Sequence, residues 1–92
     1  MIIVKSTRKD KRLEAIFKDG TSIHFGSKNG STYIDHGDKI KRENYIKRHQ
    51  VNEDWNTINA GSLSRYILWG DSNDLGKNIL DYKKKFKGFL CF

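Results

Sequence analysis

Residues 13–30, LEAIFKDGTSIHFGSKNG, contain two hairpin signals, Asp19-Gly20 and Asn29-Gly30. Both dipeptides tolerate the positive φ angles that tight hairpin turns require. Around them apolar and polar residues partly alternate, which is typical of strands with one buried face. Apolar segments at 2–4 and 33–34 extend the pattern outward. The sequence therefore predicts an antiparallel β-meander of three to four strands, with its first connection near residues 7–11.

The pattern changes after Gly37, where helical spacing replaces strand alternation. Asp38 can cap a helix over residues 39–49, because its side chain can accept hydrogen bonds from the first free backbone amides. The apolar stripe of this helix is narrow, essentially Tyr45 and Ile46. We therefore expect most of its surface to face solvent or a charged partner.

Two further helices are predicted in the second half of the chain. Ser62 can cap a short helix over residues 63–69, which Gly70 would end. The last helix is expected to start near Ser72 and to end at Gly88. Its apolar face is the most regular in the chain and consists of Leu75, Ile79, Tyr82 and Phe86.

These segments predict an α+β fold in a single domain, residues 1–92, because a chain of 92 residues supports one small core. The β-meander occupies residues 1–36, three short helices occupy 38–87, and an apolar tail follows at 88–92. Stacking on nucleic-acid bases is the alternative to burial for the two tryptophans. The residues expected to fill the space over the sheet are Tyr45, Ile46, Trp55, Leu63, Ile67, Trp69, Ile79 and Phe86.

Composition excludes several classes of protein. The chain has no apolar stretch long enough to cross a bilayer and no secretory signal pattern, so no membrane association is expected. Cys91 is the single cysteine, which excludes a disulfide scaffold and is typical of a reducing compartment. Lys and Arg exceed Asp and Glu by 18 to 11, giving a net charge of +7.

The helical half contains a distinctive combination of sequence motifs: YIKRH at 45–49, Glu53 and Trp55, AGSLSRYILW at 60–69, and DYKKKF at 81–86. This combination, over residues 20–87, resembles an uncharacterised family of small basic proteins from giant nucleocytoplasmic large DNA viruses of algae and protists. The resemblance implies a viral protein, located in the host cytoplasm or nucleus or packaged in the virion. It implies no reaction.

Residues that suggest metal binding or catalysis are few. The spacing closest to that of metal ligands is found at Asp35, His36 and Asp38. These residues include only one nitrogen ligand and lie beside a glycine turn, so no metal or other cofactor is expected. Ser62 or Ser64 with His49 and Glu53 can be imagined as a catalytic triad. Helix capping explains Ser62 more simply, and the nucleophile-elbow motif is absent. We therefore expect a protein that is not an enzyme.

Basic residues form clusters that could neutralise phosphates. One lies on the first helix, one near the first hairpin turn and one at the end of the last helix. Solvated surface and complementation of the helix dipole are the alternative interpretations. The sequence favours binding of DNA or RNA largely without sequence preference, through Lys39, Lys41, Arg42, Lys47, Arg48, Arg65, Lys83, Lys84, Lys85 and Lys87.

The apolar tail suggests a second function. Phe89, Leu90 and Phe92 could anchor the chain in a pocket of a larger protein. The chain would then be a minor capsid or scaffold component whose lysines meet acidic surfaces of viral structural proteins. Packing of the tail on its own core is the other interpretation, since a small domain needs its apolar residues.

Overall fold

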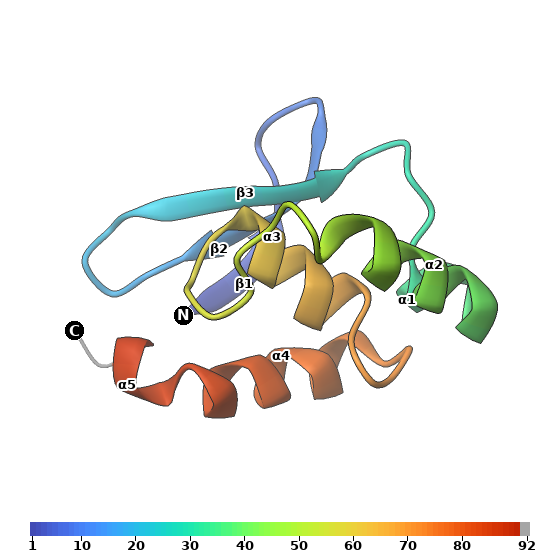
Figure 1. The fold of residues 1–92 in the computed structure, drawn as a ribbon. Coiled ribbons are helices and arrows are strands. Elements are labelled where there is room, and N and C mark those ends of the chain that lie inside the picture. The colour runs from blue at the N-terminus through green and yellow to red at the C-terminus, as the bar shows by residue number, and fades with distance from the viewer. Residues whose placement is uncertain (91–92) are drawn as a thin grey trace.

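The computed structural model describes the backbone of residues 1–90 and the side chains of residues 1–88. The predicted interface residues Phe89, Leu90 and Phe92, together with Cys91, have side chains outside the described residues. The chain forms an antiparallel sheet followed by helices, so the predicted α+β class is confirmed (Figure 1). No helix within the described part is long and apolar enough to cross a membrane.

The sheet has three strands in the order β1-β2-β3. In register, Ile3 lies opposite Ala15, and Leu13 lies opposite Phe25. Gly20 has φ +90° at the tight turn between β2 and β3, as the Asp-Gly signal predicts. The strands are β1 (Ile2–Lys5), β2 (Lys11–Ile16) and β3 (Ser22–Ser27).

The fourth strand expected at residues 33–34 is a helix instead, α1 (Tyr33–His36). A capping box between Thr32 and Asp35 explains the difference: the Asp35 carboxylate accepts from Thr32 N–H at 2.7 Å. A separate turn bond runs from Asp35 N–H to the Thr32 carbonyl at 2.9 Å. Gly37 ends the helix in the left-handed conformation at φ +62°. Asn29-Gly30 is therefore a turn between β3 and a helix, rather than a hairpin.

Helix α2 (Lys39–His49) has the predicted bounds. The Asp38 side chain accepts from the backbone amides of Ile40 and Lys41 at 2.9 and 3.2 Å, as expected of the N-cap. Tyr45 is buried and Ile46 is half-buried, so the narrow apolar stripe predicted for this helix is confirmed.

The next helix begins earlier than predicted. Asn59, rather than Ser62, is the N-cap of α3 (Ala60–Leu63), and its side chain accepts from Ser62 N–H at 2.9 Å. Ser62 takes the N3 position of the same cap, where its hydroxyl accepts from Asn59 N–H. The helix continues as a π-helix, η1 (Ser64–Leu68), in which Trp69 N–H donates to the carbonyl of Ser64, five residues earlier.

Asp74 caps α4 (Leu75–Lys85), and α5 (Lys87–Leu90) follows directly. The predicted start near Ser72 is therefore three residues early, and Gly88 lies within a helix rather than ending one. The predicted apolar face is confirmed, because Tyr82 and Phe86 are buried and Leu75 and Ile79 pack against the core.

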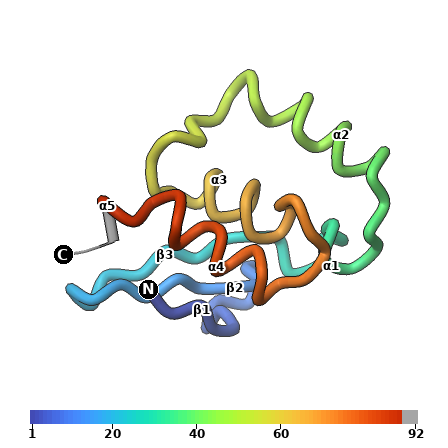
Figure 2. The backbone as a smooth tube through the Cα atoms, turned by 90° about the horizontal axis from the view of Figure 1, so that it is seen from below, coloured from blue at the N-terminus to red at the C-terminus, as the bar shows by residue number. Residues whose placement is uncertain are grey.

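Helices α3, η1 and α4 cover one face of the sheet (Figures 1 and 2). Side chains of β2 alternate accordingly, with Leu13 and Ala15 buried and Glu14 only half-buried on the opposite face. Trp55 is half-buried and contributes nothing to the core cluster, contrary to its predicted place there, because its connector lies outside Tyr66. The buried core consists of Leu13, Ala15, Phe17, Phe25, Tyr33, Tyr45, Leu63, Ile67, Leu68, Trp69, Tyr82 and Phe86.

Candidate functional site

Most arginines already have partners within the chain. Arg8 pairs with Asp10, and Arg12 pairs with Asp35. Within the described residues no lysine forms an ion pair, whereas Arg48 is the one exposed arginine on α2 without such a partner. Lysines and Arg48 therefore carry most of the charge that is free to meet another molecule.

Arg42 and Arg65, both predicted to contact nucleic acid, hold backbone carbonyls at the end of η1. Arg42 Nε donates to the carbonyl of Gly70 at 2.8 Å, and its guanidinium pairs with Asp71 at 3.0 Å. Arg65 donates to the carbonyl of Trp69 at 2.9 Å. Burial and the nearby Arg42 lower the pKa of Arg65. Both guanidiniums are thus engaged in stabilising the fold.

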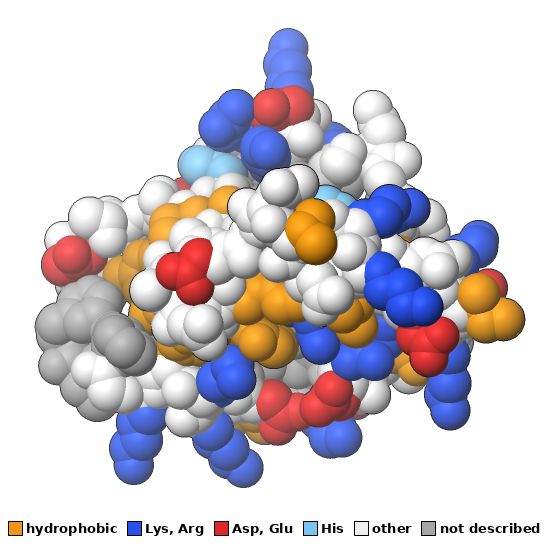
Figure 3. Space-filling view, viewed as in Figure 1, with side chains coloured by type: hydrophobic (Ala, Val, Ile, Leu, Met, Phe, Trp, Pro, Cys, Tyr) orange, Lys and Arg blue, Asp and Glu red, His pale blue; other side chains and the backbone are white. Residues whose placement is uncertain are grey.

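The predicted basic residues of α2 and of the last helix lie at opposite ends of the molecule (Figures 1 and 2). Figure 3 shows cations over the β1–β2 turn, over α2 and below the C-terminal part of α4. Lys85 lies over the Tyr66 ring, with Nζ 4.8 Å from its centroid. The cluster of Lys83, Lys84, Lys85 and Lys87 is therefore separate from that of α2.

Helix α2 itself has two charged sides. Successive residues turn by about 100°, so Lys41 and Arg48 share the side next to α1 and the cavity described below. Lys39 and Lys47 lie on the other side, with Glu43 between them at helical spacing. Only the first side is free of acidic residues.

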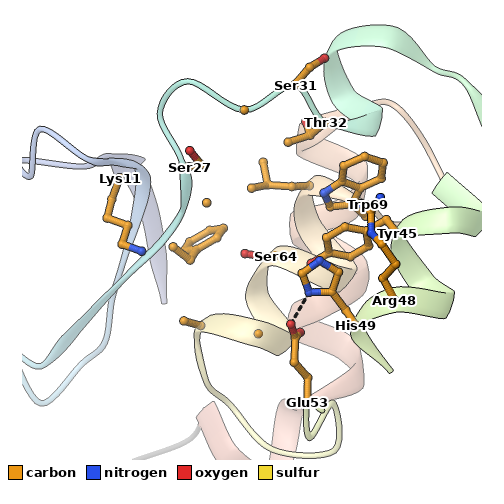
Figure 4. Close-up of a pocket in the computed structure, with 16 residues that line it drawn as sticks. Lys11, Ser27, Ser31, Thr32, Tyr45, Arg48, His49, Glu53, Ser64 and Trp69 are labelled. Atoms are coloured by element: carbon orange, nitrogen blue, oxygen red, sulfur yellow. Dashed lines mark hydrogen bonds and ion pairs between the residues drawn. The ribbon is translucent and has the colours of Figure 1, made fainter. Parts of the chain in front are cut away.

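A cavity of about 490 Å³ lies between β3, α2 and α3. Its wall on the α2 side carries Tyr45, Arg48 and His49, and Lys11 lies on the opposite wall (Figure 4). The floor and edges combine apolar residues with hydroxyl groups. They include Phe25, Gly26, Ser27, Ser31, Thr32, Ser64, Leu68 and Trp69.

Three aromatic rings form the wall on the α2 side. Tyr45 stacks on Trp69 with ring centroids 4.4 Å apart and planes within 4°, and His49 stacks on Tyr45 at 4.1 Å. Burial, with the charge of Glu53, raises the pKa of Tyr45. Trp69 and His49 cover the two faces of the Tyr45 ring, so this ring presents its edge to the cavity.

Glu53 fixes the end of this stack. Its carboxylate accepts from His49 Nδ1 and, at 2.9 Å, from the indole N–H of Trp55. Gly61 allows this approach, since a Cβ there would lie 2.9 Å from the carboxylate. The carboxylate is consequently already bonded on both oxygens.

The imagined triad is only partly assembled. His49 and Glu53 are bonded and Ser64 lines the same cavity, but Ser64 Oγ makes no hydrogen bond within residues 1–88. The Ser62 hydroxyl instead contacts Tyr82 and the carbonyl of Asn59. The pair of His49 and Glu53 orients an imidazole for stacking without reaching a nucleophile.

Metal-ligating geometry is absent from the described residues, where no three His, Cys, Asp or Glu side chains gather. In particular, Asp35 is bound by Arg12, and Asp38 caps α2. The three residues singled out for metal spacing, including His36, thus have separate structural contacts.

Sequence reasoning missed most of the cavity. Arg48 is the only residue of the predicted nucleic-acid contacts that lines it. The sequence places Lys11 in the basic cluster near the first hairpin turn, but it gives no sign that Lys11 lies near Arg48, which is 37 positions further along the chain. The available signal was the spacing of Tyr45, His49 and Glu53, four residues apart, which is suited to contacts along a helix.

Comparison with known proteins gives one match. No curated protein and no solved structure is similar enough to match this chain. A family profile matches residues 1–49, which is just over half of the chain and includes the sheet, α1 and α2. The protein therefore belongs to a family of unknown function, DUF5754.

Proposed function

We propose that this protein binds nucleic acid, largely without sequence preference and without catalysing a reaction. One observation carries the proposal: Lys11 and Arg48 lie on opposite sides of the main cavity, and neither has a carboxylate partner among the described residues (Figure 4). Two cations on either side of a cleft make the potential around it positive and attract a polyanion to it. A phosphate backbone is a polyanion with charges at regular spacing.

The cationic surface continues from the cavity along α2. Lys41 lies on the same side of the helix as Arg48, and both side chains are exposed. Lys39 and Lys47, across the helix, add longer-range attraction that salt screens. Contacts of this kind are made to phosphates, which every sequence shares. The resemblance to giant-virus proteins implies a viral genome or transcript as the nucleic acid.

The experiment is a titration with labelled duplex and single strands of mixed sequence at two salt concentrations. At low salt we expect dissociation constants of about 1–100 µM, rising steeply with salt as counterions are released. Absence of binding at low salt would refute the proposal.

A pair of charge-matched variants locates the contact. Lys41→Glu/Arg48→Glu is expected to abolish most binding, because both changes fall beside the cavity. Lys83→Glu/Lys84→Glu changes the net charge equally at the far end of the molecule and is expected to weaken binding less. Equal losses would mean that overall charge, rather than this surface, is responsible.

A minor capsid or scaffold component is the second candidate. The observation that favours it is an exposed apolar strip on the outer face of the sheet, where Ile2 and Val4 are 63% and 38% exposed and Ile2 lies opposite Ile16. An inventory of purified virions tests this role. Absence of the protein from the particles would remove it.

A further inference from the structure

A second cavity, of about 350 Å³, adjoins the first and shares with it Ser31, Arg48 and Trp69. Its other lining residues are His36 from α1 and two residues of α2, Lys41 and Asn44. The two cavities therefore meet where Arg48 and Trp69 lie. One ligand can extend from the first into the second.

The lining of the second cavity is suited to an anion. Lys41 and Arg48 supply two positive charges from one side of α2, and no Asp or Glu is among its described lining residues. Ser31 and Asn44 add neutral hydrogen-bond donors. Oxyanions such as phosphate are bound in proteins by this mixture of cations and neutral donors.

His36 also lines the second cavity. Its Nδ1 accepts a hydrogen bond from Asp38 N–H at 2.9 Å, so the proton of the neutral ring is on Nε2. That buried N–H has no acceptor within the described residues. Buried donors are almost always paired. This one is closed to an atom the size of a water oxygen, so an anion could bond to it only after His36 or its neighbours move.

The first cavity is suited to a flat, partly apolar group. Phe25 and Leu68 are buried beneath it, and the stacked rings of Tyr45 and Trp69 form one side. Hydroxyl groups at its edge can bond to ring nitrogens and carbonyl oxygens. Its volume lies within the usual range for small-molecule sites, about 300–1,000 Å³.

We infer that the joined cavities bind one nucleotide of a single-stranded nucleic acid, with its phosphate between Lys41 and Arg48 and its base in the larger cavity. The inference rests on the proposed function and names its substrate class. A base within a duplex is stacked and paired, so only an unpaired base can enter. Arg48 lies between the two subsites and contacts both parts of the nucleotide.

The test compares a labelled single-stranded oligothymidylate of about eight nucleotides with a duplex of equal length. Ser31→Phe fills the region shared by the cavities without changing charge, and Ser31 is exposed, so the fold should tolerate it. We expect this variant to weaken single-strand binding about tenfold, the scale of losing the contacts of one base, and to leave duplex binding unchanged.

Lys41→Ala/Arg48→Ala provides a second variant if Ser31→Phe misfolds. This variant is expected to bind thymidine 5′-monophosphate more weakly than the parent protein, as measured from the chemical shifts of Trp69. Thymidine, which lacks the phosphate, should bind weakly to every variant. Lys39→Ala/Lys47→Ala is the matched control on the other side of α2, and it should retain mononucleotide binding.

The outcomes separate the two claims. Equal affinity for single strands and duplex, with Ser31→Phe indistinguishable from the parent protein, would overturn the nucleotide site while leaving nonspecific binding intact. The nucleotide site would also be overturned if Lys41→Ala/Arg48→Ala and Lys39→Ala/Lys47→Ala lost thymidine monophosphate binding equally. No binding of any nucleic acid at low salt would remove the proposed function and this inference together.

Discussion

Arg12 and Asp35 form a two-point ion pair that joins β2 to α1, with nitrogen–oxygen distances of 2.6 and 2.8 Å. The same carboxylate accepts from the backbone N–H and the hydroxyl of Thr32. Asp35 therefore combines a helix cap with a tertiary contact. Its position sets the start of α1 next to the candidate site.

Asp35→Asn is expected to lower the free energy of unfolding at pH 7 by about 1 kcal/mol, a value reduced because the pair is partly exposed. The Arg12 guanidinium, with hydrogen bonds from Thr32, holds the pKa of Asp35 well below its usual range. A lowered pKa means that this stability is present above the unfolded-state pKa and lost as pH falls. Urea unfolding from pH 7 down to acid should show the two proteins converging below about pH 4.

Asp10→Asn is the matched control. Arg8 and Asp10 also form a two-point pair, but their side chains are 54% and 62% exposed and lie within one turn. We expect no measurable change in stability. A loss equal to that of Asp35→Asn would show that the tertiary position of Asp35 contributes nothing.

Arg42→Ala is expected to lower the free energy of unfolding by about 2 kcal/mol, because it leaves the half-buried carbonyl of Gly70 without its charged donor. Lys41→Ala, one residue earlier and exposed, should change stability by less than about 0.5 kcal/mol. Nucleic-acid titration of the same two proteins should show the opposite order, with Lys41→Ala weakening binding more. If Arg42→Ala is fully stable yet binds poorly, Arg42 contacts the nucleic acid instead.

The buried hydroxyl of Tyr82 leads us to expect that the protein loses stability at alkaline pH. The Tyr82 side chain is buried, and burial raises the pKa of its hydroxyl to about 12. Because the pKa is raised, the contribution of neutral Tyr82 to the free energy of unfolding is fully present below the unfolded-state pKa near 10. It falls as pH rises toward 12, by about 2 kcal/mol in all. Tyr82→Phe should lose about 1 kcal/mol at neutral pH and then show a shallower alkaline decline.

Ultraviolet absorbance of tyrosinate and denaturant unfolding at several alkaline pH values measure this. The Ser62 hydroxyl keeps its bond to the Asn59 carbonyl in the variant, so the change is confined to one hydrogen bond. Parallel alkaline curves for the two proteins would contradict the assignment.

Gly26→Ala tests the close contact beneath the cavity. Gly26 has φ +79°, and an added Cβ would lie 2.7 Å from Leu68 Cδ1. Gly20→Ala is the control, because φ is +90° there but no atom lies within 4 Å. We expect Gly20→Ala to reduce stability by about 1 kcal/mol from backbone strain and Gly26→Ala by about 2–3 kcal/mol. Equal losses in thermal or denaturant unfolding would mean that Leu68 moves aside freely.

Local signals predicted much of the fold. Asp19-Gly20 located the β2–β3 turn, and Asp38 located the start of α2, because both act through their own backbone neighbours. The short apolar segment at 33–34 was assigned to a strand, since two residues do not distinguish strand from helix periodicity. The Thr32 and Asp35 capping box was the deciding signal there.

The remaining differences depend on tertiary structure. Asn59 and Ser62 can both cap a helix, and only the paired hydrogen bonds between them select Asn59. The meeting of Lys11 and Arg48 at one cavity likewise depends on how the folded chain places β2 relative to α2. Charge clustering along the sequence therefore predicts a class of partner without locating a site.

The extra residue in the turn of η1 has a consequence for the evolution of this protein. A π turn contains one residue more than an α turn, so the residues that follow are rotated by about 100° relative to an uninterrupted helix. Trp69 follows directly, and this rotation accompanies its parallel alignment with Tyr45. A single-codon deletion within residues 64–68 would direct the indole away from its neighbour while leaving the composition almost unchanged. We therefore expect the ring stack to be more sensitive to a change of length in this segment than to an exposed substitution within it.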